Sequence, residues 1–224
     1  MKNKKNLWLS ILILALFALW TLLISVADVQ PIGPNGSAVG LAQINGWFHK
    51  LTGANMTLYH ITDWLGLVPV AFGFGFAVLG LKQWIQRKHI LKVDRSILVL
   101  GLYYILVLAA YLLFEEFVIN YRPVLIAGYL EASYPSSTTL LVLSVMPTLI
   151  FQARLRLHRP LIKQILAMIT IAFSVFMVIG RLISGVHWIT DIIGSLLLSS
   201  GLFCLYLAAV HRFCHHHLNN NFDI

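Results

Sequence analysis

A histidine and an aspartate lie four residues apart near the C-terminal end of this 224-residue sequence, at His187 and Asp191. On a helix this spacing places both side chains on one face, so the carboxylate can hold one ring nitrogen of the histidine. The other ring nitrogen is then free to attack an electrophile. The pair therefore predicts nucleophilic catalysis by His187, with Asp191 as its orienting partner.

Two arginines indicate what the electrophile is. Arg181 precedes His187 by six residues, and Arg122 comes from an earlier part of the chain. A continuous helix would place Arg181 and His187 on different faces, but the pair Ser184-Gly185 offers a break that lets them converge. Two converging guanidiniums suit a phosphate, because each can bind it through a bidentate fork.

A predicted helix start at Ser136 and Ser137, directly after a proline, adds a second anion-binding element. The free N–H groups, the hydroxyls and the helix dipole at such an N-terminus favour a bound phosphate. The whole set describes phosphoryl transfer through a phosphohistidine. Because the arginines and the helix amides can stabilise the developing charge, we expect no cofactor and no metal. The three histidines at 215–217 are too few for a structural metal site and predict a polar end of the chain.

The elements that must position these residues are membrane helices. Hydrophobic residues make up 59% of the chain and charged residues 11%, against roughly 25% charged residues in an ordinary soluble domain. This composition excludes a disordered chain, and two cysteines exclude a disulfide scaffold. The sequence therefore predicts an all-α, polytopic membrane helix bundle that forms a single domain over residues 1–224.

Six apolar segments are long enough to cross a bilayer, which takes about 20 residues. They cover residues 7–27, 61–81, 96–114, 136–153, 165–183 and 188–210. Between the first two, apolar residues recur at helical spacing from Leu41 to Leu51 and include Trp47. This pattern predicts a short amphipathic helix at the membrane interface. It leaves open whether that helix is a structural plug or a gate over the site.

The charges predict the orientation of the bundle. The chain has 16 basic and 8 acidic residues, which gives a net charge of +8. All the basic residues except Lys50, Arg122 and Arg181 fall before the first span, in alternate connectors, or after the last span. The positive-inside rule makes that side cytoplasmic, with both termini in the cytoplasm. The charge is then a topology signal rather than a sign of nucleic-acid binding, and the site lies on the extracytoplasmic side of the plasma membrane.

Each candidate feature has a simpler explanation when taken alone. An arginine near a membrane end is commonly a snorkelling anchor, a histidine at a helix start is commonly a cap, and serines after a proline make a good helix start. Their joint position on one predicted face, which carries almost no other basic residue, favours the phosphate site, because ionisable groups at such depths are costly.

The order of these motifs resembles the type-2 phosphatidate phosphatase (lipid phosphate phosphatase) superfamily, whose three motifs read K-x6-R-P, P-S-G-H and S-R-x5-H-x3-D. This chain has Arg122-Pro123, then Pro135-Ser136-Ser137-Thr138, then Gly180-Arg181 followed by His187 and Asp191. The third spacing matches fully, as do six spans with an extracytoplasmic site. The resemblance implies that His187 is the nucleophile and Asp191 its orienting partner. It also implies that Arg122, Arg181 and Ser136 bind the phosphate, with help from the Ser137 amide.

Three positions depart from the family pattern. Glu115 stands where the family has lysine, Thr138 where it has the general-acid histidine, and Gly180 where it has serine. Losing the lysine weakens phosphate binding, and losing the acid removes an effect worth roughly 10²–10⁴-fold. Glu116 or Glu131 could act as a substitute acid if burial raised its pKa, although a solvated loop carboxylate is the simpler interpretation of both.

The leading hypothesis is an integral-membrane lipid phosphatase or diphosphatase at the outer leaflet. A diphosphate such as undecaprenyl diphosphate is favoured over phosphatidate, because its leaving group is a phosphate with a second pKa of about 6 and needs less help from an acid. The expected partners are the lipid phosphate and membrane lipids, with no nucleic acid and no obligatory protein partner. The alternative is a catalytically impaired relative that binds or transports lipid phosphates. A small-solute transporter ranks last, because the spans have few polar residues near their middles.

Overall fold

The computed structural model describes residues 2–213, so Cys214 and the histidines at 215–217 lie outside the described residues. The helices found there are α1 (Lys2–Val26), α2 (Ala42–Thr52), α3 (Met56–Leu65), α4 (Leu67–Arg87), α5 (Arg95–Glu116), α6 (Ser137–Arg156), α7 (Pro160–Ile183) and α8 (Ile189–Phe213). Within the described part the extended segments form isolated bridges and no strand. The predicted all-α fold is confirmed.

Six helical segments of the described chain are long and apolar enough to cross a membrane, as expected. Five of them match the predicted spans to within a few residues at each end. The segment predicted at 61–81 is longer, because it lies inside a continuous stretch from Met56 to Arg87 formed by α3 and α4. These two helices meet at Gly66, whose added Cβ would lie 2.9 Å from the Asp63 carbonyl oxygen. The absence of a side chain there allows the tight junction.

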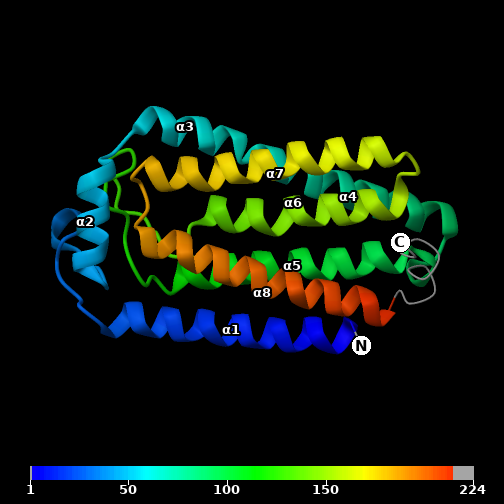
Figure 1. Cartoon of the computed structure of the whole chain (residues 1–224), viewed down its shortest axis with the longest axis horizontal. Coiled ribbons are helices and arrows are strands. Elements are labelled where there is room, and N and C mark those ends of the chain that lie inside the picture. Colours follow the sequence, from blue (N-terminus) through cyan, green and yellow to red (C-terminus); the bar gives the residue numbers. More distant parts are fainter. Residues whose placement is uncertain (1, 214–224) are drawn as a thin grey trace.

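Helix α8 lies at the centre of the bundle and packs against α1, α5 and α6 (Figure 1). It runs antiparallel to α1, since the Ser10 hydroxyl donates to the Gly201 carbonyl (2.8 Å) and the Trp20 indole donates to the Thr190 carbonyl (3.2 Å). The start of α1 and the end of α8 therefore share one end of the molecule. Gly201 makes the contact close, because an added Cβ would lie 2.7 Å from the Leu14 side chain.

The two ends of the bundle carry different chemistry. At the end where α8 finishes, Asp94 pairs with Arg87 (2.9 Å) and with Arg156 (3.4 Å), which ties the α4–α5 connector to α6. The predicted site residues lie at the opposite end, where the α5–α6 loop meets the turn between α7 and α8 (Figure 1). The separation of most basic residues from the site agrees with the predicted topology, while the side that faces the cytoplasm remains a prediction.

The predicted amphipathic helix is present as α2, at the same end as the site. Its inner face carries Asn45, whose side-chain amide donates to the Thr190 hydroxyl (3.0 Å) at the start of α8. Its outer face carries Ile44, Trp47 and Leu51, which are exposed. This division into a protein-facing and an outward apolar face is the one that an interfacial helix requires.

Candidate active site

His187 lies in a short turn between α7 and α8, which replaces the continuous helix that would have separated it from Arg181. The break falls at Gly185, as the sequence predicts, and this residue has a φ of +64°. An added Cβ would lie 1.7 Å from the Gly53 carbonyl oxygen, so this turn has room only for glycine. The linker between α2 and α3 thus packs directly on the turn, and the Asn55 N–H donates to the Ser184 carbonyl (2.8 Å).

Two guanidiniums converge on one nitrogen of the His187 ring. The Nε2 atom lies 3.4 Å from Arg122 Nη1 and 3.3 Å from Arg181 Nη2. All three side chains are buried, with 8%, 1% and 3% of Arg122, Arg181 and His187 exposed. Because a guanidinium has donors and no acceptor, Nε2 must present a lone pair to both arginines. The nitrogen that faces the predicted phosphate position is therefore the unprotonated, nucleophilic one.

The other ring nitrogen is held by Ser133 and not directly by Asp191. The His187 Nδ1–H donates to the Ser133 carbonyl (3.1 Å), and the Ser133 hydroxyl lies 3.1 Å from the same nitrogen. That hydroxyl donates to Asp191 Oδ2 (2.5 Å), whereas Asp191 Oδ2 and His187 Nδ1 are 3.7 Å apart, too far for a hydrogen bond. The i, i+4 spacing does place the two side chains side by side, but the Ser133 hydroxyl takes the place of the expected direct hydrogen bond, and the orienting role of Asp191 stays a prediction.

The surroundings of His187 keep its ring neutral. Burial, followed by the nearby charges of Arg122 and Arg181, holds the pKa of His187 well below its ordinary value of 6.5, and the bond to the Ser133 carbonyl offsets this in part. A histidine with a lowered pKa is unprotonated at neutral pH. The ring is therefore in the form that a nucleophile needs before substrate arrives.

Helix α3 holds the two guanidiniums in place. Arg181 Nη1 lies 3.6 Å from Asp63, and the Tyr59 ring centroid lies 4.9 Å from Arg181 Cζ and 6.0 Å from Arg122 Cζ, within cation–π range. Arg122 Nε also pairs with Glu131 (3.1 Å). Buried cations need such partners, because desolvation is costly. The roles of Tyr59 and Asp63 were missed, although their i, i+4 spacing near a predicted span end was an available signal.

The start of α6 lies beside the site, with its three polar residues in different roles. Ser136 is the N-cap, but its hydroxyl donates to Thr139 (3.1 Å) and its N–H to the Asp191 carbonyl (3.3 Å). It therefore joins α6 to α8, and its predicted contact with phosphate would require the hydroxyl to rotate. Ser137 faces the same pocket as His187, whereas Thr138 faces an apolar groove.

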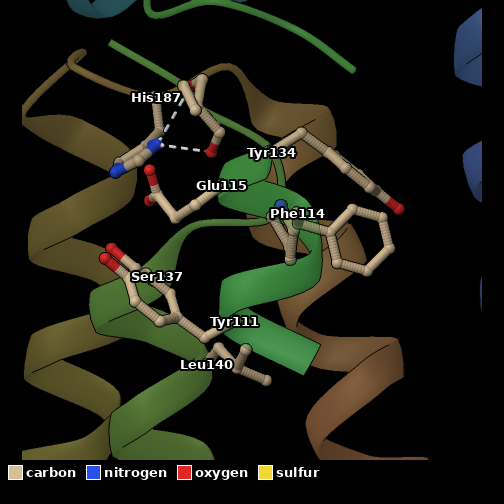
Figure 2. Close-up of a pocket in the computed structure, with 10 residues that line it drawn as sticks. Tyr111, Phe114, Glu115, Tyr134, Ser137, Leu140 and His187 are labelled. Atoms are coloured by element: carbon tan, nitrogen blue, oxygen red, sulfur yellow. Dashed lines mark hydrogen bonds between the residues drawn. The ribbon is translucent and has the colours of Figure 1, made fainter. Parts of the chain in front are cut away.

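A small pocket lies beside the His187 ring. Its polar lining comes from Glu115, Ser133, Ser137 and His187, and Figure 2 shows Glu115 entering it from the last turn of α5. Its volume of about 10 Å³ is near the lower limit for holding one water molecule. Of the two loop acids that the sequence suggested as substitutes, Glu131 is paired with Arg122, and neither it nor Glu116 lines this pocket.

An apolar groove leads from this pocket along the bundle. It has a volume of about 660 Å³ and runs between α4, α5 and α6. The pocket and the groove share Tyr111, Ser137 and Leu140, so they meet at the start of α6. A second apolar cavity of about 580 Å³ continues between α4 and α5, with Gly73, Ala77 and Tyr104 common to both cavities. Together they form an apolar path from the site into the membrane-spanning part of the molecule.

Close packing explains one departure from the family motif. An added Cβ at Gly180 would lie 2.7 Å from the Thr62 methyl group on α3, closer than real Cβ contacts. The serine found there in the family would therefore push α3 away from α7. Since α3 carries Tyr59 and Asp63, the glycine allows the helix that positions the arginines to pack closely.

Comparisons with known proteins agree with this architecture. A family model described as the PAP2 superfamily matches residues 97–214, which include every predicted site residue. Among solved structures, the chain is similar to the first transmembrane PAP2 type phosphatidylglycerolphosphate phosphatase from Bacillus subtilis, with a TM-score of 0.57 and 17% identity, covering 91% of this chain and 96% of that one. At this identity the likeness shows the fold. No curated protein matches the chain.

Proposed function

This chain belongs to the PAP2 superfamily, and we propose that it removes phosphate from a lipid phosphate at the outer leaflet through a phosphohistidine on His187. One observation carries the proposal. The buried, unprotonated Nε2 of His187 lies 3.3–3.4 Å from the guanidiniums of Arg122 and Arg181. A phosphate held by both guanidiniums would bring its phosphorus within reach of that lone pair.

The reaction proceeds in two displacements. His187 Nε2 attacks the phosphorus while the bond to the lipid oxygen breaks, and the arginines stabilise the charge on the phosphoryl oxygens. The imidazolium that forms keeps its Nδ1–H bonded to the Ser133 carbonyl, and Asp191 stabilises it through the Ser133 hydroxyl. Water then attacks the phosphohistidine, which releases inorganic phosphate and restores the neutral ring.

The apolar groove supports a lipid as the substrate. It meets the catalytic pocket at Tyr111, Ser137 and Leu140, so a phosphate beside His187 would place its attached chain at the head of the groove. The groove and the cavity that continues it have volumes of about 660 and 580 Å³. This space suits a long hydrocarbon chain more than a small polar solute.

The leaving-group argument favours a lipid diphosphate such as undecaprenyl diphosphate. Thr138 occupies the position of the family's general acid and faces the groove, where its hydroxyl is a poor proton donor. A diphosphate releases a lipid monophosphate, which needs less protonation than an alkoxide. We place the site on the extracytoplasmic side of the plasma membrane, with both termini in the cytoplasm, because most basic residues lie at the opposite end.

A second candidate function is binding or transport of lipid phosphates without turnover. The observation that favours it is the carboxylate of Glu115 in the catalytic pocket, where an anion opposes the binding of phosphate. The geometry of His187 favours catalysis instead, since a binding protein has no need for a neutral imidazole held between two guanidiniums.

Phosphate release from purified protein separates the two candidates. The assay compares undecaprenyl diphosphate with phosphatidate, with His187→Ala as the inactive variant and Ser199→Ala as a control for a buried site-distant change on α8. We expect release from the diphosphate, loss of release in His187→Ala, and little effect of Ser199→Ala. Release that survives in His187→Ala would contradict the mechanism, and no release from either lipid would support the binding candidate.

A further inference from the structure

A proton at the leaving oxygen speeds the proposed reaction, most of all for a lipid monophosphate, and the family's histidine for this purpose is replaced by Thr138. We propose that Glu115 is the catalytic acid and base: it donates a proton to the leaving oxygen and then accepts one from the attacking water. This role rests on the phosphatase function proposed above. It assigns a purpose to the residue that stands where the family has a lysine.

The position of Glu115 fits the place where the proton is needed. Its side chain extends from the last turn of α5 into the pocket that His187 and Ser137 also line (Figure 2). Tyr111 lies one turn earlier on α5 and lines both this pocket and the apolar groove. The proposal places the oxygen that joins the phosphate to the lipid chain where pocket and groove meet, at Tyr111, Ser137 and Leu140, and Glu115 lines the pocket beside that junction.

The other carboxylates near the site have partners already. Glu131 pairs with Arg122 (3.1 Å), and Asp63 lies 3.6 Å from Arg181. Asp191 accepts from the Ser133 hydroxyl and from the Trp188 N–H (2.8 Å). Within residues 2–213, no ion pair to Glu115 is found. Its partner is Tyr111, with which it forms a side-chain hydrogen bond, and of the carboxyl groups named here it is the one that lines the pocket beside His187.

The proposal requires one proton between the Glu115 carboxylate and the bound phosphate. Two anions in one small pocket repel each other, and a proton shared between them relieves that repulsion. A lysine at this position would attract the phosphate but would leave no acid, once Thr138 has replaced the histidine. The two departures from the family motif then form one change, in which the acid moves from the first turn of α6 to the last turn of α5.

The proton balance closes over the two steps. In the first, the bond from Nε2 to phosphorus forms, the bond from phosphorus to the lipid oxygen breaks, and the Glu115 proton passes to that oxygen. In the second, a water oxygen bonds to phosphorus, the nitrogen–phosphorus electron pair returns to His187, and a water proton passes to the Glu115 carboxylate. The pocket between these two side chains, about 10 Å³, is near the lower limit for holding one water molecule.

The test compares Glu115→Gln with Glu116→Gln. Both side chains are exposed, but only Glu115 lines the pocket. The substrates are undecaprenyl phosphate and undecaprenyl diphosphate, which share a tail and differ in the leaving group. We expect Glu115→Gln to slow release from the monophosphate roughly 10²-fold and to slow the first step with the diphosphate much less. We also expect phosphohistidine to accumulate with the diphosphate, because attack by water has lost its base. Glu116→Gln keeps the wild-type behaviour, and Glu115→Asp recovers part of the rate.

Two results would overturn the role of Glu115 alone: wild-type rates in Glu115→Gln, or an equal slowing with both lipids and no accumulated phosphohistidine. Wild-type protein that releases phosphate from neither lipid would overturn the proposed function, and this role with it. Equal thermal unfolding temperatures for Glu115→Gln and Glu116→Gln check that a rate difference is not a folding difference.

Discussion

Ser133→Ala tests the link between His187 and Asp191 that the structure reveals. The change removes the hydroxyl that donates to Asp191 Oδ2 at 2.5 Å and lies 3.1 Å from His187 Nδ1. A hydrogen bond to a charged group contributes about 1.5–3 kcal/mol, and about 1.4 kcal/mol corresponds to tenfold in rate. The Ser133 carbonyl remains and still accepts from Nδ1–H, so the ring keeps its tautomer. We therefore expect kcat to fall at the lower end of this range, about tenfold.

The assay is initial-rate phosphate release from undecaprenyl diphosphate, with kcat and KM determined separately. KM should change less than kcat, because the Ser133 hydroxyl contacts Asp191 and His187 Nδ1 and not the two arginines proposed to bind the phosphate. Ser199→Ala is the matched control, since it removes a buried serine hydroxyl that bonds within α8 away from the site. Wild-type kcat in Ser133→Ala would refute the bridging role. A loss as large as that of His187→Ala would also refute the estimate, because it would mean that the carbonyl does not fix the ring.

Three further predictions concern pH, backbone and leaving group. Because its pKa is lowered, the His187 ring stays neutral below pH 6.5, and we expect kcat/KM to stay constant as the pH falls through 6.5. Arg122→Gln removes a nearby positive charge, so the fall of kcat/KM in acid should begin at a higher pH than in the wild type. Measuring kcat/KM against pH for both proteins checks this. The unfolded chain takes up this proton first, so His187 also makes the fold less stable as pH falls below about 6.5, measurable as a lower unfolding temperature. Gly185→Ala should reduce folded yield and activity sharply, whereas Gly128→Ala, which also has a positive φ but no atom within 4 Å of an added Cβ, should cost only about 1–2 kcal/mol of unfolding free energy. Thr138→His should raise turnover of a lipid monophosphate, and unchanged turnover would count against the leaving-group argument.

The membrane fold could be predicted because its signals are local in the sequence. Apolar runs of the right length marked all six spans. The basic residues in alternate connectors predicted which ends of the spans lie on the same side of the membrane. The main error in a boundary, at residues 61–81, arose because the polar residues of α3 concealed its continuity with α4. Those residues include Tyr59 and Asp63, which contact Arg181 of the site rather than lipid.

The candidate site could be predicted where its residues share one segment. The spacing of Arg181, His187 and Asp191 along the chain predicts a shared site, and the glycine break that lets them converge is visible in the sequence. Ser133 could not be predicted, because its position comes from tertiary pairing: its N–H donates to the Asn120 carbonyl (2.9 Å), and this pairing folds the α5–α6 loop back on itself. The sequence shows that Glu115 stands where the family has a lysine. Only the structure shows that its carboxyl group lies in the pocket beside His187.

Rapid-quench labelling tests the central claim most directly. Wild-type protein is mixed with undecaprenyl diphosphate labelled in its terminal phosphate, quenched in base within the first turnover, digested and analysed by mass spectrometry. We expect a base-stable, acid-labile phosphoryl group on the peptide that contains His187, formed before phosphate is released and absent in His187→Ala. Turnover with no labelled peptide, or with the label on another residue, would contradict phosphoryl transfer through His187.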